Sequence, residues 1–128
     1  MNIYERIFER LEKLGIDPRN IPEYAKSKSG GYMDLNLDRL YVESDHTIIA
    51  LSHYSEQEGD LVPDPDMQVR IYPDTKMAEA LTYQDTYTYT EVYPGGDTID
   101  TKAKKDLNQF LFTWLTNCIN QGHSFKEV

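Results

Sequence analysis

The densest run of chemically competent side chains lies between residues 53 and 66, where one histidine and five carboxylates occur. Carboxylate oxygens and a neutral imidazole are ligands for divalent cations, so one hypothesis is a metal-binding protein or a metal-dependent enzyme. In the enzymatic version the histidine acts as the base. The ligand set of this hypothesis is His53, Glu56, Asp60, Asp64 and Asp66.

The spacing of these residues matches no established metal motif. An EF-hand needs alternating aspartates, a glycine and a glutamate at position twelve, and the zincin helix needs a second histidine. Aspartates beside Gly59, Pro63 and Pro65 are also typical turn residues. The alternative is therefore an ordinary loop over residues 55–65. No catalytic residue is assigned, and we expect no cofactor.

A second candidate site is the tyrosine-rich run before residue 94. The chain has 10 tyrosines, and threonine alternates with tyrosine over residues 86–90 of the run 86–93, which is typical of a strand. Such a row offers an aromatic surface that can bind a partner. Alternatively, the rings cover the sheet beneath a helix. The candidate binding residues are Tyr83, Tyr87, Tyr89, Glu91 and Tyr93.

The charge balance restricts the class of partner. Lys and Arg number 13 against 22 Asp and Glu, a net charge of −9. This balance argues against direct binding of nucleic acid and of anionic membranes. It favours a protein partner of basic character, although an aromatic edge strand also permits self-association. No long apolar run or signal segment is evident, so we expect a cytoplasmic protein.

Helical periodicity occurs near both ends of the chain. Apolar residues recur at helical spacing over residues 2–14 and again over residues 101–121. Asn2 and Asp100 are predicted N-caps, and Gly15 and Gly122 are predicted C-terminal stops. Lysines crowd the first turns of the second helix, where the helix dipole disfavours cations. This crowding predicts that acidic residues lie opposite.

Alternating polar and apolar residues predict strands between the helices, at residues 32–37, 40–43, 47–54, 67–72, 77–83 and 86–93. The pattern slips around residues 38–39, which indicates a β-bulge or a separate short strand. Residues 77–83 also contain strong helix formers, so a short helix is the alternative there. Residues 47–54 suit a central strand covered on both sides.

The predicted fold is therefore α+β: a mostly antiparallel meander sheet of about four to six strands, with an N-terminal and a C-terminal helix packed on it. Residues 1–128 are expected to form a single domain, in which the loop at residues 17–31 and the tail at residues 124–128 are mobile. The predicted core comprises Ile7, Leu11, Leu35, Ile49, Leu51, Val69, Ile71, Leu81, Leu111, Trp114 and Cys118.

The central segment also carries a resemblance. The residues at 50–54, 56–57, 59–62 and 64–67, with similar runs at 80–84, 91–93 and 107–115, resemble a family of small bacterial proteins with a domain of unknown function. Members of this family are often carried on plasmids, phages and conjugative elements. The resemblance covers roughly residues 32–123 and implies no activity. The resulting hypothesis is a small, non-enzymatic protein-binding or regulatory accessory protein of a bacterium or mobile element.

Overall fold

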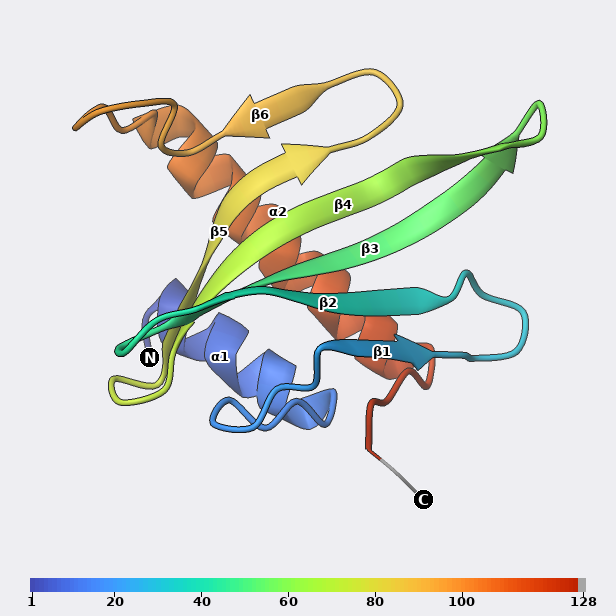
Figure 1. Ribbon diagram of the computed structural model, residues 1–128, viewed down its shortest axis with the longest axis horizontal. Helices are drawn as coiled ribbons and strands as arrows, with labels where there is room; N and C mark the ends of the chain where they lie inside the picture. The colour runs from blue at the N-terminus through green and yellow to red at the C-terminus, as the bar shows by residue number, and fades with distance from the viewer. Residues whose placement is uncertain (127–128) are drawn as a thin grey trace.

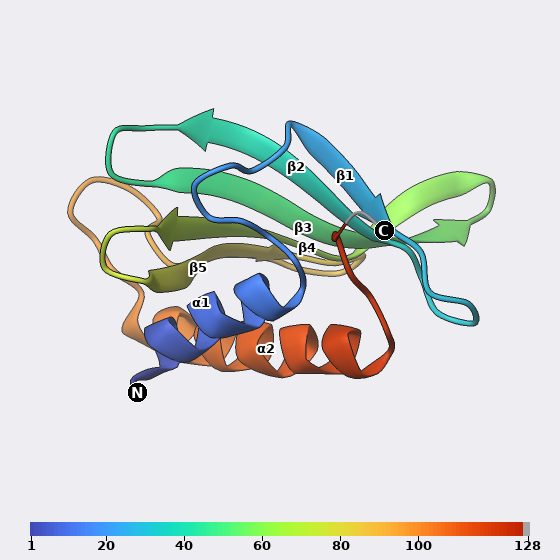
Figure 2. The same cartoon turned by 90° about the horizontal axis from the view of Figure 1, so that it is seen from below.

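Six antiparallel strands follow one another in chain order in a single sheet, and two helices lie on the same side of it (Figure 1, Figure 2). The computed structural model describes residues 1–126. This arrangement confirms the predicted α+β class. The elements are α1 (Ile3–Lys13), β1 (Tyr24–Ser27), β2 (Leu35–Val42), β3 (Thr47–Gln57), β4 (Asp60–Tyr72), β5 (Met77–Gln84), β6 (Tyr89–Glu91) and α2 (Thr101–Asn120).

Both helices begin at the predicted capping residues. The Asn2 side chain accepts a hydrogen bond from the Glu5 backbone N–H at 2.9 Å, and the Glu5 carboxylate accepts one from the Asn2 N–H. Asp100 caps α2 in the same way, accepting from the Ala103 N–H at 2.9 Å. Gly15 follows α1 with φ of +89°, a left-handed conformation that favours glycine.

The hydrophobic core lies between the helices and one face of the sheet. Because side chains alternate across a strand, Leu37, Leu51 and Met67 lie in register on three neighbouring strands and are all fully buried. Every residue of the predicted core is buried. The core prediction is therefore confirmed.

Two segments predicted as loops contain strands. Within residues 17–31, β1 pairs with β2 from Tyr24 to Ser27. Residues 55–65 belong to the long β3–β4 hairpin, which projects beyond the rest of the sheet (Figure 1) and turns through Glu58 and Gly59, both at positive φ. The prolines of β4 suggested a loop. They are tolerated in the strand because they precede Asp66, where pairing with β5 begins, so no hydrogen bond to β5 is needed from a residue that lacks an N–H.

The structure also distinguishes between the alternatives for residues 38–39 and residues 77–83, and it shortens the last strand. The register between β2 and β3 shifts between Arg39 and Tyr41, which confirms a bulge. Residues 77–83 form a strand, so the helical alternative is wrong. The last strand is shorter than predicted because the Asp85 carboxylate accepts hydrogen bonds from the backbone N–H groups of Tyr87 and Thr88, which folds residues 85–88 into a turn.

The coverage of β3 differs from expectation. β3 is central, but the described helices cover only one of its faces (Figure 2). The tail after α2 contacts β1 and the end of α1: the Ser124 N–H donates to the Ser27 hydroxyl at 2.9 Å, and the Phe125 N–H donates to the Leu14 carbonyl at 2.7 Å. Residues 127–128, the end of the segment expected to be mobile, lie outside the described residues.

We predict that Trp114→Ala lowers the free energy of unfolding by about 3–5 kcal/mol, because the indole is buried and its removal leaves a cavity. Trp114 is 7% exposed and packs edge-on against the ring of His53 at 5.3 Å. Urea denaturation measures the loss. The exposed neighbour Thr113, changed to Ala, is the control and should stay within about 0.5 kcal/mol of wild type. Equal stability of the two variants would mean that α2 does not dock as described.

Candidate binding face of the sheet

The face of the sheet opposite the helices carries an ordered array of polar side chains, which we call the helix-free face. Residues directly opposite on antiparallel strands share a face, so the strand registers place two rows there, each with one residue from every strand. The first row is Tyr24, Asp38, Ala50, Gln68, Thr82 and Glu91. The second row is Lys26, Asn36, Ser52, Asp66, Gln84 and Tyr89.

The side chains of the first and second rows are small on the central strand and large on the two edge strands. The central strand β3 contributes the small residues Ala50 and Ser52, whereas β1 and β6 contribute Tyr24 and Tyr89, which are 53% and 57% exposed. A hollow of about 470 Å³ opens over Ala50. The face is thus a shallow polar trough with a tyrosine on each edge strand.

The trough contains two carboxylates that face the same hollow, Asp38 and Asp66. Neither forms an ion pair with another residue among residues 1–126. Burial, reinforced by the negative charge of Asp38, raises the pKa of Asp66 above its ordinary value, although a hydrogen bond from the Tyr54 hydroxyl at 3.2 Å opposes this shift. These two carboxylates therefore share one hollow without a direct ion-pair partner in the described part of the chain.

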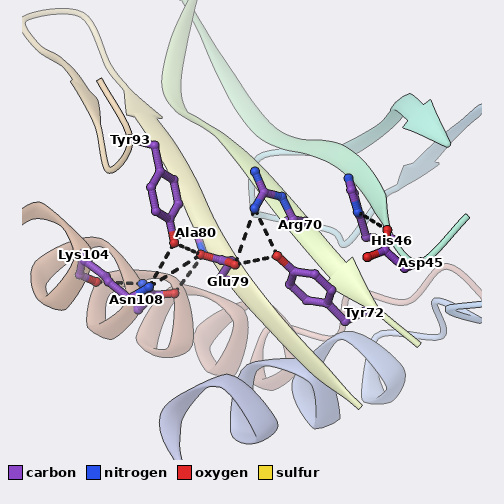
Figure 3. A network of polar contacts seen from close by, with 9 residues as sticks. All are labelled: Asp45, His46, Arg70, Tyr72, Glu79, Ala80, Tyr93, Lys104 and Asn108. Atoms are coloured by element: carbon purple, nitrogen blue, oxygen red, sulfur yellow. Dashed lines mark hydrogen bonds and ion pairs between the residues drawn. The ribbon is translucent and has the colours of Figure 1, made fainter. Parts of the chain in front are cut away.

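A contrasting, fully compensated carboxylate lies at one end of the same face (Figure 3). Glu79 is directly opposite Arg70, and one of its oxygens is 3.8 Å from the Arg70 guanidinium. The Tyr72 hydroxyl donates to Glu79 at 2.8 Å, and the Tyr93 hydroxyl also donates to it. The Lys104 ammonium completes the set at 3.8 Å. We call these five residues the Glu79 network.

The Glu79 network forms where β6 ends and the edge of β5 is left without a strand partner. There, α2 supplies polar groups to that edge: Asn108 accepts a hydrogen bond from the Ala80 N–H at 2.8 Å, and Lys104 reaches Glu79 (Figure 3). The expectation of acidic residues opposite the lysines holds for Lys104, which faces Glu79, whereas Lys102 pairs with Asp106 of the same helix at 2.6 Å. The network therefore locks the border of the sheet to α2.

The predicted tyrosine row is not brought together on one surface. Tyr89 and Glu91 lie on the helix-free face, where the Tyr89 hydroxyl donates to Glu91 at 2.9 Å. Tyr83 points to the helix side and packs edge-on against a phenylalanine of α2. Tyr87 lies in the preceding turn and is 90% exposed, and Tyr93 belongs to the Glu79 network. The row separates because β6 is only three residues long.

The predicted metal ligands are also kept apart. His53 is buried on the helix side, with Nδ1 2.8 Å from the Asp34 carbonyl and Nε2 3.7 Å from Cys118 Sγ. Asp66 lies on the opposite face of the sheet. The other three predicted ligands, Glu56, Asp60 and Asp64, lie along the projecting hairpin and are exposed. Within residues 1–126, no group of three or more histidine, cysteine or acidic side chains is placed to hold a metal ion.

Cys118 is buried, as its place in the predicted core indicates. It is 1% exposed, and burial raises the pKa of its thiol to about 12. A thiol in this state is a weak nucleophile at neutral pH, because the thiolate is the reactive form.

Among the residues of the helix-free face, the sequence pattern marked Asp66, Tyr89 and Glu91 as candidates but not the others. Asp38 lies where the alternation slips, and Gln68 is an ordinary outward residue of the predicted strand 67–72, so neither is distinctive in the sequence. The signal that identifies them is cross-strand alignment, which needs the register of all six strands. The signal for Glu79 in the sequence is only indirect: the lysines near the start of α2 indicated an acidic residue opposite them, and Lys104 faces Glu79.

We predict that Glu79→Gln lowers the free energy of unfolding by about 1.5–3 kcal/mol, because it removes the acceptor of charge-assisted hydrogen bonds. Arg70 and Lys104 then lose their common counter-charge. Chemical denaturation at neutral pH measures the change. Glu91→Gln, on the same face but outside the Glu79 network, is the control and should be nearly neutral. If both variants lose the same stability, the network does not anchor the edge of the sheet.

His123 predicts a defined acid sensitivity. It is 3% exposed, and its Nδ1 is 2.9 Å from the Ser27 hydroxyl. Burial, together with nearby His53, lowers the pKa of His123 below its usual 6.5, against weaker opposing influences of the Met33 backbone and of Asp34. The unfolded chain therefore binds the proton more tightly than the native one. Protonation of His123 therefore destabilises the native state. This destabilisation is absent well above pH 6.5 and grows as the pH falls below that value.

Denaturation midpoints measured between about pH 7.5 and about pH 5 test this dependence. The slope below pH 6.5 should flatten in His123→Gln, even if that variant is less stable throughout. His46→Gln is the control, because His46 lies beside Asp45 at the other end of the sheet, with its Nδ1 2.7 Å from the carboxylate. An unchanged slope in His123→Gln would assign the acid sensitivity to another group.

None of the helices within residues 1–126 is long and apolar enough to cross a membrane.

Among curated proteins and among solved structures, none matches the chain significantly. One family model does match: that of a domain of unknown function, DUF6908, over residues 2–124. This match covers nearly the whole chain and agrees with the resemblance to a domain of unknown function. The chain belongs to the DUF6908 family.

Proposed function

We propose that this protein is a small, non-enzymatic protein-binding module, and that it binds its partner through the helix-free face. The observation that carries the proposal is the pair of polar rows that crosses all six strands on the face left open by the helices. Such an array presents hydrogen-bonding groups with exposed tyrosines at its edges, the composition typical of recognition surfaces.

Charge favours a basic protein over the other classes of partner. The net charge of −9 repels nucleic acid and anionic membranes. It also opposes self-association through this face, because Asp38 and Asp66 of two copies would approach each other. A basic protein is attracted instead, and complementary charge raises its rate of encounter. The cytoplasmic location and the role as an accessory of a bacterial mobile element are part of this proposal.

The metal-dependent alternative has weaker support. Its ligands come from opposite faces of the sheet and from the projecting hairpin, and convergence would require the β3–β4 pairing to break. By contrast, binding at the helix-free face needs no rearrangement of the backbone.

Photo-crosslinking in the native host tests the proposal. A benzophenone amino acid at Gln68, in the trough, should capture a protein that the same group at Gln109, exposed on α2, does not capture. The captured protein is then purified and titrated against the wild-type chain. We expect Tyr24→Ala and Tyr89→Ala each to weaken binding about tenfold, as for residues that anchor an interface.

Tyr87→Ala is the matched control, because this tyrosine is the most exposed of the large hydrophobic residues yet lies in a turn outside the two rows. It should bind like wild type. Equal capture from both positions, equal weakening by all three variants, or capture of a second copy of this chain would overturn the proposal. Sizing of the free protein by analytical ultracentrifugation distinguishes the last outcome.

A further inference from the structure

The middle of the helix-free face has the chemistry of a site for a single cationic side chain. Its hollow of about 470 Å³ is lined by three carboxylates, those of Glu23, Asp38 and Asp66. Arg39 also lines the hollow, but its guanidinium donates to the Ile21 backbone carbonyl at 2.9 Å. None of the three carboxylates forms an ion pair within residues 1–126. A cation entering this hollow would relieve the repulsion between the carboxylates.

A buried hydroxyl beside the hollow points independently to a missing partner. Ser52 is 1% exposed, lies opposite Asp66 in the second row, and its Oγ has no hydrogen-bond partner in the described part of the chain. A buried polar group left unpaired costs free energy, so most such groups are paired in native structures. Ser52 lies two residues from Ala50 on the same face of β3, next to the hollow.

Tyrosines flank the same place. Tyr24 lines the hollow from β1, and its hydroxyl donates to Asn36 at 3.2 Å. The Tyr54 hydroxyl donates to Asp66, which ties this second ring to the carboxylate. Aromatic rings beside carboxylates are the usual surroundings of bound ammonium and guanidinium groups, because the ring face attracts a cation. The floor, Ala50, is small enough to leave room for a long side chain.

From this arrangement, which rests on the proposed function, we infer that the hollow holds a lysine or arginine side chain of the partner polypeptide, between Asp38 and Asp66. The partner segment then lies across the trough, with its neighbouring residues over the polar rows. A divalent cation is the weaker alternative, since no group of three metal-ligating side chains converges within residues 1–126.

A phage-displayed library of random short peptides tests the inference without knowledge of the partner. Peptides selected on the wild-type protein should share a lysine or arginine at one position. Replacing that residue by norleucine or citrulline should weaken binding at least about tenfold, which is the scale of an interface anchor. Amide shifts in ¹⁵N NMR spectra should concentrate at Ala50, Asp66 and Gln68.

Charge-matched variants locate the cation. Asp38→Asn combined with Asp66→Asn should also weaken the selected peptide at least about tenfold. The control, Glu12→Gln combined with Asp97→Asn, removes the same charge from exposed positions outside the two rows and should weaken it far less. Circular dichroism spectra and melting temperatures verify that both variants fold.

The outcomes separate the two proposals. If peptides bind the trough without a shared basic residue, or bind both double variants equally, the inference is overturned while the proposed binding face stands. If the selected peptides shift only residues of α1 or α2, both fail. If spermidine binds as tightly as the best peptide, the hollow is a site for free amines, and the assignment to a polypeptide side chain is overturned.

Discussion

Burial of one face of the sheet beneath both helices is the constraint on which the rest of the structure depends. Leu35, Ile49 and Val69 are fully buried on that face, and each contributes about 1.5–3 kcal/mol by leaving water. Because a strand alternates its side chains between faces, packing one side under the helices sends every second residue to the other side. The polar rows of the helix-free face are therefore the direct complement of the core.

The helix-free face holds carboxylates in two different physical states. Glu79 accepts hydrogen bonds from two tyrosine hydroxyls and lies 3.8 Å from both an arginine and a lysine, so its charge is compensated within the protein. Asp38 and Asp66 share a hollow, and neither forms an ion pair within residues 1–126. A compensated carboxylate fixes geometry, whereas an uncompensated one favours binding of an external cation. Under the proposed function, stability and recognition thus fall at different ends of one surface.

The edges of the sheet explain why this surface is well defined. β6 pairs with only the last residues of β5, and the exposed part of β5 is closed by Asn108 and Lys104 from α2. An edge left open at that point would invite pairing with another chain. At the other end, the projecting β3–β4 hairpin continues the two central strands past the trough. The result is a sheet whose β5 border is fixed to α2 and whose polar face is left open by the described helices.

Residues close in the chain were enough to determine the helices, their caps, the antiparallel order and the core, because capping and hydrophobic periodicity are local properties. Local pattern failed where a tertiary contact outweighed it. The β3–β4 hairpin extends through a proline- and glycine-rich segment because β3 offers a complete pairing partner, and β6 is short because the Asp85 side chain holds a turn. The candidate binding face depended wholly on tertiary structure. Its rows draw one residue from each of six strands, and only the register between strands decides which side chains meet.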